Sequence, residues 1–320
     1  MVHILEQLKE VVDEAGILTG DAVSDRIGVW GTNQSMQALA IIRPQNTDQV
    51  SSILKLCNSN RQAIVPQGGM TGLVKAGMPD SSEIAVSLER MNSILEVDFD
   101  TATITVEAGV TLQDAQEAAD AHGLMLPLDL GARGSATIGG NLSTNAGGNR
   151  VIRYGMTRDM VLGIEAVLAD GTILSSLNKV LKNNAGYDLK QLFIGGEGTL
   201  GIITKAVLRL RPKPKSENTA FISVNGFDNV VKLLRSLEVS LSGTLSAYEV
   251  MWESAYKVLT GDHSHNTKPF PLGPSHFVLV EALGGDPITD KDRFEIALGE
   301  ALQAGLASCL LYTSDAADDG

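Results

Sequence analysis

The chain has 320 residues, 43% of them hydrophobic and 20% charged, which is typical of a soluble globular protein with room for two domains. Its net charge of −13 excludes a nucleic-acid-binding face, because no basic surface is available to neutralise phosphates. A small anionic substrate stays compatible with this charge, since a local cluster of Arg or Lys can outweigh the global field. No stretch is apolar for the roughly eighteen residues that a membrane span needs.

The chain begins with a pattern that predicts an amphipathic helix and not a secretory signal peptide. Apolar residues recur there at helical spacing among Glu, Lys and Asp, whereas a signal peptide has a basic start and an unbroken apolar run. The two cysteines, Cys57 and Cys309, lie far apart and show neither CxxC nor metal-ligand spacing. They indicate free thiols, and from them we expect a cytoplasmic protein.

Helices and strands alternate after residue 35. Thr47 and Asp48 are expected to cap a helix that runs to Asn60, and Thr111 a helix that runs to His122 with Gly123 as its stop. Strands are predicted at residues 63–66, 84–87, 104–107, 161–169, 172–174 and 206–210, with a β-hairpin turn at 170–171. This alternation favours an α+β domain with a mixed sheet.

A stiff polar connector, RPKPKS at residues 211–216, marks the clearest domain boundary. Beyond it, strands are predicted at 221–224, 245–250 and 276–281, and helices at 228–238, between the last two strands, and at 292–305. We therefore expect a helical segment at 1–35, a first domain at 36–214 and a second at 215–308. Residues 309–320, CLLYTSDAADDG, show no pattern that continues the domain and are expected to be a non-native tail; a frayed acidic C-terminus is the alternative.

Three glycine-rich segments stand out within the first domain. Residues 127–148 hold six glycines among small polar side chains, residues 66–72 read PQGGMTG after a short apolar strand, and residues 193–203 alternate glycine with branched apolar residues. Glycine lets other groups approach the main chain, and free backbone N–H groups form anion-binding concavities. Tight turns in a β-rich domain are the alternative, but three such segments favour a surface for a flat, phosphate-bearing cofactor. The loop at residues 66–72 is neither a Walker motif nor GxGxxG, and Lys75 lies outside the GxxxxGK[ST] frame.

These segments carry a resemblance to a known family. PQGGMTG, PLDLGARGSATIGGN, TNAGG, RYG, GYDLKQLFIGGEGTLGIIT and RLRPKP resemble the FAD-binding domain of the vanillyl-alcohol oxidase and para-cresol methylhydroxylase (PCMH) superfamily, over roughly residues 25–300. Within it, the chain is most similar to the FAD-linked D-2-hydroxyacid dehydrogenases, the branch with D-2-hydroxyglutarate and D-lactate dehydrogenases. The resemblance implies an α+β fold: a PCMH-type two-subdomain FAD-binding domain with a mixed sheet, followed by the first part of an α+β, ferredoxin-like cap domain.

The resemblance also implies which residues bind FAD. They are Pro66, Gln67, Gly68, Gly69, Met70, Thr71, Gly72, Pro127, Asp129, Leu130, Gly131, Ser135, Thr137, Ile138, Gly139, Gly140, Asn141, Thr144, Asn145, Ala146, Gly147, Gly148, Glu197, Gly198, Leu200, Gly201, Ile202 and Ile203. Some superfamily members attach the flavin through a His in the first glycine loop, where this chain has Met70 and its branch usually has Asn. A thioether cannot form the histidyl bond, so noncovalent FAD is expected.

The implied activity is oxidation of a D-2-hydroxyacid, D-2-hydroxyglutarate above all, to the 2-oxo acid. A hydride would pass to flavin N5, and the electrons to a separate acceptor such as an electron-transfer flavoprotein or a quinone. D-lactate or glycolate dehydrogenase is one alternative, and a flavin-binding fragment without turnover is another. In the family, the C-terminal part of the cap holds a divalent metal such as zinc and supplies the base. Those positions fall outside this chain, so its catalytic residues stay unknown and we expect a truncated, inactive chain.

Several charged and polar residues stay open to two interpretations. Arg133, Arg150, Arg153 and Arg158 are either surface charges or a positive field that offsets the FAD phosphates or guides a carboxylate. The H-x-H pair of His263 and His265 is either a metal pair or, as favoured, a polar loop.

Four further residues have candidate roles, two within the motifs and two in the second domain. Asp129 and Glu197 are interpreted as acceptors that order their loops. The run Tyr248-Glu249 matches a Phe/Tyr-Glu run of the family and belongs either to a flavin cavity or to the core.

Overall fold

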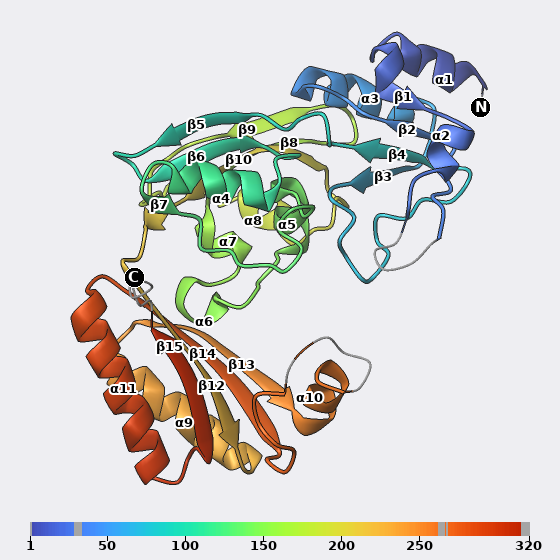
Figure 1. Cartoon of the computed structure of the whole chain (residues 1–320). Helices are drawn as coiled ribbons and strands as arrows, with labels where there is room; N and C mark the ends of the chain where they lie inside the picture. The colour runs from blue at the N-terminus through green and yellow to red at the C-terminus, as the bar shows by residue number, and fades with distance from the viewer. Residues whose placement is uncertain (1, 29–33, 262–265, 267, 315–320) are drawn as a thin grey trace. The chain divides into compact units, whose positions relative to one another are not determined.

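The computed structural model describes residues 2–28, 34–261, 266 and 268–314, and the chain divides into two compact units (Figure 1). The first unit comprises Met1–Ala146 and Met156–Pro212, and the second comprises Gly147–Gly155 and Lys213–Gly320. The division after Pro212 lies within the polar connector. The grouping of Gly147–Gly155 with the second unit was not expected from the sequence. In the part of the chain that the structure describes, no helix has the length and apolarity to cross a membrane.

The first unit contains a mixed four-stranded sheet in the order β1-β2-β4-β3. Its strands are β1 (Ile17–Leu18), β2 (Ala40–Ile42), β3 (Ile64–Gln67) and β4 (Ile84–Ser87). β4 pairs in parallel with both β2 and β3, whereas β1 pairs antiparallel with β2. Residues before 36 thus contribute a strand to the sheet, in addition to the helices α1 (Val2–Lys9) and α2 (Asp21–Ser24) and the 3₁₀ turn η1 (Glu14–Gly16).

A five-stranded antiparallel sheet forms the second layer of this unit, in the order β5-β6-β10-β8-β9. Its strands are β5 (Ile94–Asp98), β6 (Thr103–Glu107), β8 (Val161–Val167), β9 (Ile173–Ser176) and β10 (Ile202–Arg209). A two-stranded ladder pairs β7 (Leu124–Met125) with β11 (Arg211–Pro212). The helices are α3 (Thr47–Ser59), α4 (Leu112–Asp120), α5 (Ile138–Thr144), α7 (Thr157–Met160) and α8 (Lys190–Phe193).

One of the two predicted helix N-caps is observed, and the other differs by one residue. Thr111 caps α4 as expected, its hydroxyl accepting from the Asp114 N–H at 3.1 Å. At α3 the cap is Asn46, which accepts from the Gln49 N–H at 3.0 Å, and not the expected Thr47. Asn is the stronger N-cap residue, and Thr47 instead donates its hydroxyl to Glu165 of β8 at 2.6 Å. α3 is thereby joined to the five-stranded sheet.

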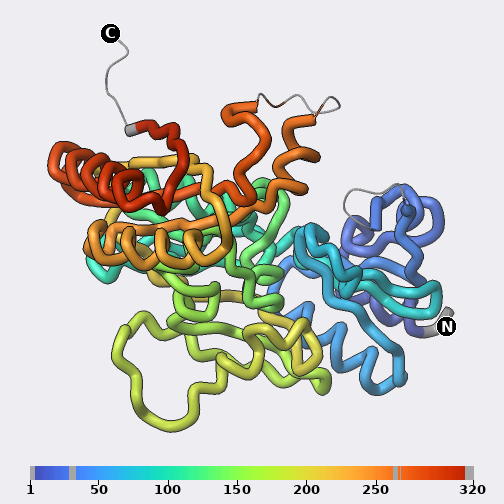
Figure 2. Tube along the Cα trace, turned by 90° about the horizontal axis from the view of Figure 1, so that it is seen from below, coloured from blue at the N-terminus to red at the C-terminus, as the bar shows by residue number. Residues whose placement is uncertain are grey.

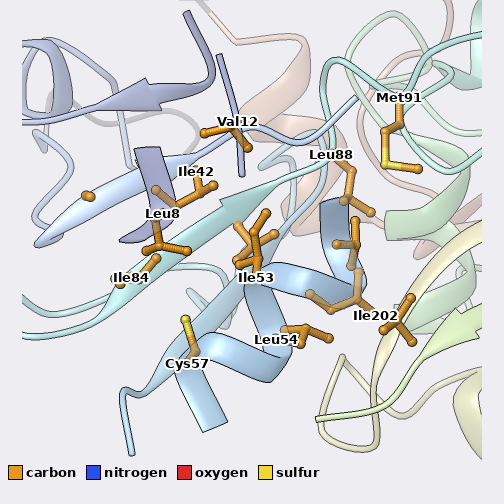
Figure 3. Close-up of a cluster of buried hydrophobic side chains, with 14 of the residues drawn as sticks. Leu8, Val12, Ile42, Ile53, Leu54, Cys57, Ile84, Leu88, Met91 and Ile202 are labelled. Atoms are coloured by element: carbon orange, nitrogen blue, oxygen red, sulfur yellow. The ribbon is translucent and has the colours of Figure 1, made fainter. Parts of the chain in front are cut away.

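Helices α1 and α3 build the core of the four-stranded sheet (Figure 3). Leu8 of α1, Ile53 of α3 and Ile84 of β4 are fully buried there. Burial of one large aliphatic side chain contributes about 1.5–3 kcal/mol, so this cluster is the main source of stability for the layer. Cys57 lies in the same cluster, where burial raises the pKa of its thiol to about 11 and keeps it protonated.

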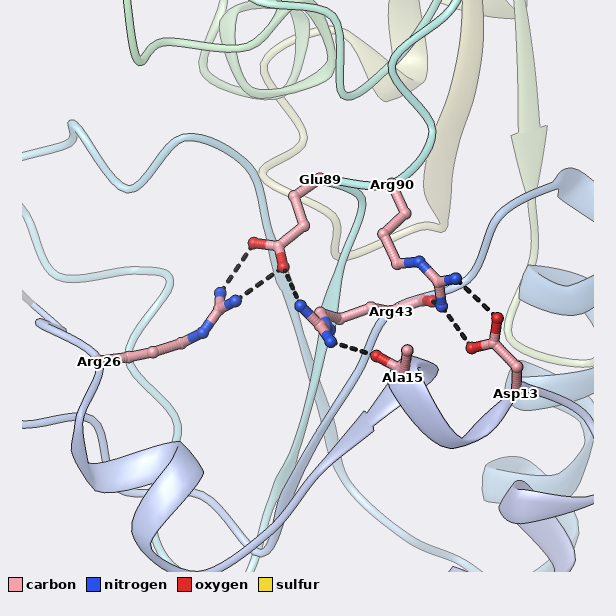
Figure 4. Close-up of polar contacts among 6 residues, drawn as sticks. All are labelled: Asp13, Ala15, Arg26, Arg43, Glu89 and Arg90. Atoms are coloured by element: carbon pink, nitrogen blue, oxygen red, sulfur yellow. Dashed lines mark hydrogen bonds and ion pairs between the residues drawn. The ribbon is translucent and has the colours of Figure 1, made fainter.

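A polar cluster fixes the N-terminal residues onto this sheet (Figure 4). Both carboxylate oxygens of Glu89, which follows β4, accept from the Arg26 guanidinium at 2.7 and 2.8 Å, and one also accepts from Arg43 at 2.9 Å. Arg43 also donates to the Ala15 carbonyl, and Arg90 forms a two-point pair with Asp13 at 2.7 Å. Bidentate Arg–carboxylate pairs hold one geometry, so they set how residues 13–26 lie on the sheet.

The second unit folds as βαββαβ around an antiparallel four-stranded sheet in the order β13-β14-β12-β15, the ferredoxin-like arrangement (Figure 1). Its strands are β12 (Ser216–Val224), β13 (Leu245–Trp252), β14 (His276–Gly284) and β15 (Cys309–Ser314). Its helices are α6 (Val151–Tyr154), α9 (Phe227–Ser240), α10 (Glu253–Leu259) and α11 (Pro287–Gln303). α9 and α11 lie side by side in both overall views and bury one face of the sheet (Figure 2).

The strand β15 differs from the expectation that the pattern ends at residue 308. Its residues pair antiparallel with β12 from Ser223↔Cys309 to Asn218↔Ser314. Leu310 packs against the core beneath α9 and α11, whereas Leu311 is 49% exposed. The alternating pattern of CLLYTS was the overlooked signal, because the edge of β12 offers unpaired backbone groups that a short strand can satisfy. Residues 315–320 of the expected tail lie outside the described residues.

We expect the cluster around Glu89 to make stability depend on pH. The Arg26 guanidinium, with help from Arg43, lowers the pKa of Glu89 from its ordinary 4.5 to about 2. A carboxyl with a lowered folded-state pKa contributes stability above its unfolded pKa and loses it as the pH falls towards the folded value. The contribution of Glu89 is therefore complete above about pH 5 and is lost between about pH 4.5 and 2.

Urea midpoints measured from pH 7 to pH 2 check this expectation. The original chain should lose more stability over the acid range than Glu89→Gln, whose neutral amide cannot titrate. Glu14→Gln is the matched control, because Glu14 forms no ion pair among the described residues. Parallel pH profiles for the original chain and Glu89→Gln would contradict the assigned role.

Candidate cofactor site

The three glycine segments meet around one cavity in the first unit. The first segment contributes the end of β3 and the loop after it, the second contributes α5, and the third contributes the loop before β10 together with the start of that strand. The expected residues that line the cavity are Pro66, Gln67, Gly68, Gly69, Met70, Thr71, Gly72, Leu130, Thr137, Gly139, Gly140, Asn141, Thr144, Ala146, Glu197, Gly198, Gly201, Ile202 and Ile203.

The remaining expected residues lie off this cavity lining. Pro127 and Ile138 are buried, and Asn145 ends α5 in the left-handed conformation with φ +49°. Gly147 and Gly148 belong to the second unit, so they are separated from the segment with which the sequence grouped them. The others that do not line the cavity are Asp129, Gly131, Ser135 and Leu200.

Sequence reasoning missed eight lining residues of two kinds. Val74, Lys75, Ala76, Gly77 and Ser143 adjoin the motifs, so a wider window around each motif would have included them. Gly28, Leu88 and Ala108 come from distant parts of the chain, and only folding brings them to the cavity.

The first and second segments touch through their backbones. A Cβ added to Gly68 would lie 2.7 Å from the Thr137 hydroxyl oxygen and 3.2 Å from the Gly140 Cα, and one added to Gly69 would overlap the Ser135 carbonyl oxygen. These two glycines are needed because the protein packs against them. From the sequence, we expected only a cofactor to approach these glycines closely. Gly72, by contrast, has nothing within 4 Å of such a Cβ.

The second segment is partly helical, where the sequence suggested a loop. Thr137 caps α5 by accepting from the Gly140 N–H at 3.3 Å, and Ile138 and Leu142 are buried. Packing of these two side chains outweighs the low helix propensity of the two glycines. The last carbonyls of α5 accept from the third segment, Leu142 from Gly195 at 3.0 Å and Ser143 from Glu197 at 2.9 Å. The second and third segments therefore form one hydrogen-bonded body.

Asn141 shows that the cavity suits a ligand with acceptor oxygens. Its side chain is 5% exposed, it lines the cavity, and its Nδ2 has no hydrogen-bond partner among the described residues. A buried N–H left unpaired costs about 1–3 kcal/mol, which a phosphate or carbonyl oxygen of a bound ligand would offset. The residues present thus fit a phosphate-bearing cofactor such as FAD.

The arginines near the second segment do not line this cavity. Arg150 donates to both carboxylate oxygens of Glu281 at 2.9 and 2.7 Å, and Arg153 donates to the Leu283 and Thr244 carbonyls; both contacts lie within the second unit. Arg158 donates to Gln191 and to the Ile194 carbonyl at 3.0 Å each. These three arginines therefore have structural partners. The cavity lining holds one basic residue, Lys75, and one acidic residue, Glu197.

Met70 occupies the left-handed region with φ +52° and lines the cavity. This region is uncommon for a residue other than glycine and favours Asn among the exceptions. The Met70 side chain packs against a small cluster that includes Met36 and Ile41, so its thioether is held in an apolar setting.

The histidines and the Tyr248-Glu249 run contribute no recognisable catalytic cluster. His122 is exposed at the end of α4, and His276 is buried with its Nδ1 2.8 Å from the Ser275 hydroxyl. His263 and His265 lie outside the described residues, and within those residues no three His, Cys, Asp or Glu could hold a metal ion.

Tyr248 and Glu249 differ in their surroundings, as neighbours on a strand do. The Tyr248 hydroxyl donates to the Val230 carbonyl of α9 at 2.7 Å, and burial raises the pKa of that hydroxyl, so Tyr248 belongs to the core. Glu249 is exposed, although partial burial raises the pKa of its carboxyl.

We expect Gly69→Ala to disrupt the contact between the first two segments. The added methyl overlaps the Ser135 carbonyl, and overpacking of this kind costs about 1–3 kcal/mol. Gly72→Ala is the matched control and should change the unfolding free energy by no more than about 0.5 kcal/mol. Thermal unfolding of the two variants measures the difference, and equal melting temperatures would refute the close approach.

Asn141→Leu separates stability from binding. The substitution removes an unpaired buried N–H, so the protein without cofactor should be as stable as the original chain or more stable. Affinity for FAD should fall about tenfold or more, since a hydrogen bond to a charged group contributes about 1.5–3 kcal/mol. Differential scanning fluorimetry and fluorescence titration with FAD measure the two quantities. Unchanged FAD affinity would show that Nδ2 does not meet the ligand.

Comparison with known proteins identifies the domain that contains the first two glycine segments. Residues 38–176 match the family model of the FAD binding domain. The chain is 42% identical over 309 residues to the probable mitochondrial D-2-hydroxyglutarate dehydrogenase of Oryza sativa subsp. indica, covering 94% of this chain and 54% of that protein. It is 41% identical over 266 residues to the mitochondrial D-2-hydroxyglutarate dehydrogenase of Rattus norvegicus, covering 83% and 49%. The chain thus spans about half the length of the curated relatives it matches.

The names of these relatives contradict the cytoplasmic location expected from the cysteines. Both are named as mitochondrial proteins. Cysteine usage separates oxidising compartments from reducing ones, but it does not separate one reducing compartment from another, so the expectation was wrong.

A solved structure confirms the fold expected from the motifs. p-Cresol methylhydroxylase with substrate bound superimposes with a TM-score of 0.76 at 18% identity, covering 97% of this chain and 65% of that one. Residues 38–176 therefore belong to the FAD binding domain family, the chain is similar to D-2-hydroxyglutarate dehydrogenases over about half of their length, and it shares its fold with p-cresol methylhydroxylase.

Proposed function

We propose that the cavity of the first unit binds FAD noncovalently and that the FAD-containing protein oxidises a D-2-hydroxyacid, D-2-hydroxyglutarate above all, to the 2-oxo acid. The observation that carries the proposal is the meeting of three glycine segments around one cavity that contains the unpaired Nδ2 of Asn141. The relatives named as D-2-hydroxyglutarate dehydrogenases favour this substrate over D-lactate or glycolate.

The residues of the cavity divide into two groups by chemistry. The backbone of Gly68 and Gly69 and the amide of Asn141 offer donors for phosphate oxygens. Ile202 and Ile203 provide an apolar wall at the start of β10, against which a flat ring can pack without losing hydrogen bonds. FAD, when bound, supplies the hydride acceptor, and a separate acceptor then takes the electrons.

The loop chemistry supports noncovalent attachment. Residue 70 is Met, which offers no nitrogen for a histidyl bond to the flavin. We therefore expect acid to release the flavin from the protein.

The test begins with the purified chain mixed with FAD. Its absorbance spectrum should show bound flavin, and acid precipitation should leave the flavin in the supernatant. Fluorescence that stays with the denatured polypeptide would contradict noncovalent binding, and absence of any bound flavin would contradict the whole proposal.

Oxidation is tested by anaerobic mixing with D-2-hydroxyglutarate. Loss of flavin absorbance near 450 nm, roughly the flavin maximum, reports hydride transfer, and L-2-hydroxyglutarate is the matched control. Bleaching by the D form alone supports the dehydrogenase. Bound flavin that neither form bleaches would agree with the inactive, flavin-binding chain expected from the sequence and would refute turnover by this chain.

A further inference from the structure

We propose that Lys75 is the cation that pairs with the pyrophosphate of FAD, a role that no glycine motif in the chain would assign to it. This inference rests on the proposed FAD binding and deepens it. Lys75 lines the same cavity as the glycine segments and is the basic residue of that lining. Because a pyrophosphate carries two negative charges, a cation at this place would stabilise it beyond what backbone N–H groups supply.

The turn that carries Lys75 is fixed at its far end. The Gln67 amide, in a side chain that is 4% exposed, donates to the Gly77 carbonyl at 2.8 Å, and the Met78 N–H donates to the Lys75 carbonyl at 3.0 Å. Gln67 is the last residue of β3, so the strand that begins the first glycine segment also positions the Lys75 turn. The backbone of this turn is thereby held beside the cavity, and Lys75 itself is exposed.

Among the residues that the structure describes, Lys75 has no competing partner. It forms no ion pair with any residue that the structure describes, and Glu197, the acidic residue of the lining, is not paired with it. Arg150, Arg153 and Arg158 are bound to Glu281, Gln191 and main-chain carbonyls, and Arg133 is exposed and does not line the cavity. In a chain with a net charge of −13, an anionic ligand gains most from the cation that remains available at its site.

The backbone of Lys75 adds an independent observation. Its φ is +61°, a conformation that glycine adopts freely and that is uncommon for a residue with a Cβ. Strain of this kind is concentrated at functional sites. A positive φ at a residue that lines the cavity therefore agrees with a functional role for Lys75.

The experiment uses ligands that differ in phosphate. FAD carries a pyrophosphate, whereas riboflavin carries none. We expect Lys75→Met to weaken FAD binding about fivefold at low salt, since a partly exposed charge pair contributes up to about 1 kcal/mol. Riboflavin affinity should stay unchanged, and the FAD difference should disappear in about 1 M NaCl, where the Debye length is about 3 Å. Fluorescence titration measures all affinities.

Three further variants separate the effect of charge from that of structure. Lys75→Gly should raise thermal stability by relieving the positive φ and yet weaken FAD binding as Lys75→Met does. Lys182→Met removes one positive charge from an exposed residue that does not line the cavity and should leave FAD affinity unchanged. Lys75→Arg keeps the charge and should keep most of the affinity.

The outcomes are distinct. Equal FAD affinity for the original chain and Lys75→Met, or equal weakening of FAD and riboflavin, would overturn the role of Lys75 while FAD binding itself stands. Failure of the original chain to bind either flavin would overturn both proposals. Weakening that is confined to FAD and sensitive to salt supports the pairing.

Discussion

The close approach of two backbones, Gly68–Gly69 against residues 135–140, is the constraint on which the rest of the site depends. It brings the end of β3 onto α5, and α5 in turn receives the third segment through its last carbonyls. Parts of the four-stranded and five-stranded sheets are thereby joined at one point. A cavity built in this way needs few large side chains, because the shape comes from where the main chain can and cannot touch itself.

The sequence predicted the elements whose signals are local. β4 was expected at its observed bounds, and the Thr111 cap and the Asp170-Gly171 hairpin follow from side-chain hydrogen bonding and from the positive φ of Gly171. α5 was not expected as a helix, because its stability comes from burial of Ile138 and Leu142, which the propensities of Gly139 and Gly140 conceal. β15 was missed for a related reason: a six-residue edge strand depends on the neighbour that it pairs with.

The charged residues of the candidate site could not be assigned from local sequence patterns either. Residues within the motifs could be assigned to one cavity because glycine spacing reflects local backbone needs. Which cations lie free at that cavity depends on distant partners, and Glu281 is 131 positions from Arg150. No local pattern reveals that Arg150 is already bound to a carboxylate, or that Lys75, outside every motif, has no such partner.

The segment Gly147–Gly155 means that neither unit is one continuous stretch of chain. During synthesis, Arg150 emerges long before the strands β13 and β14 that receive it, whereas domains generally fold in order from the N-terminus. The first unit must therefore complete its five-stranded sheet while residues 147–155 are still solvated. The two ends of that segment are held together by hydrogen bonds from the Thr157 N–H and hydroxyl to the Ala146 carbonyl. The second unit then forms after the first. Its completion pairs the Arg150 guanidinium, solvated until then, with Glu281.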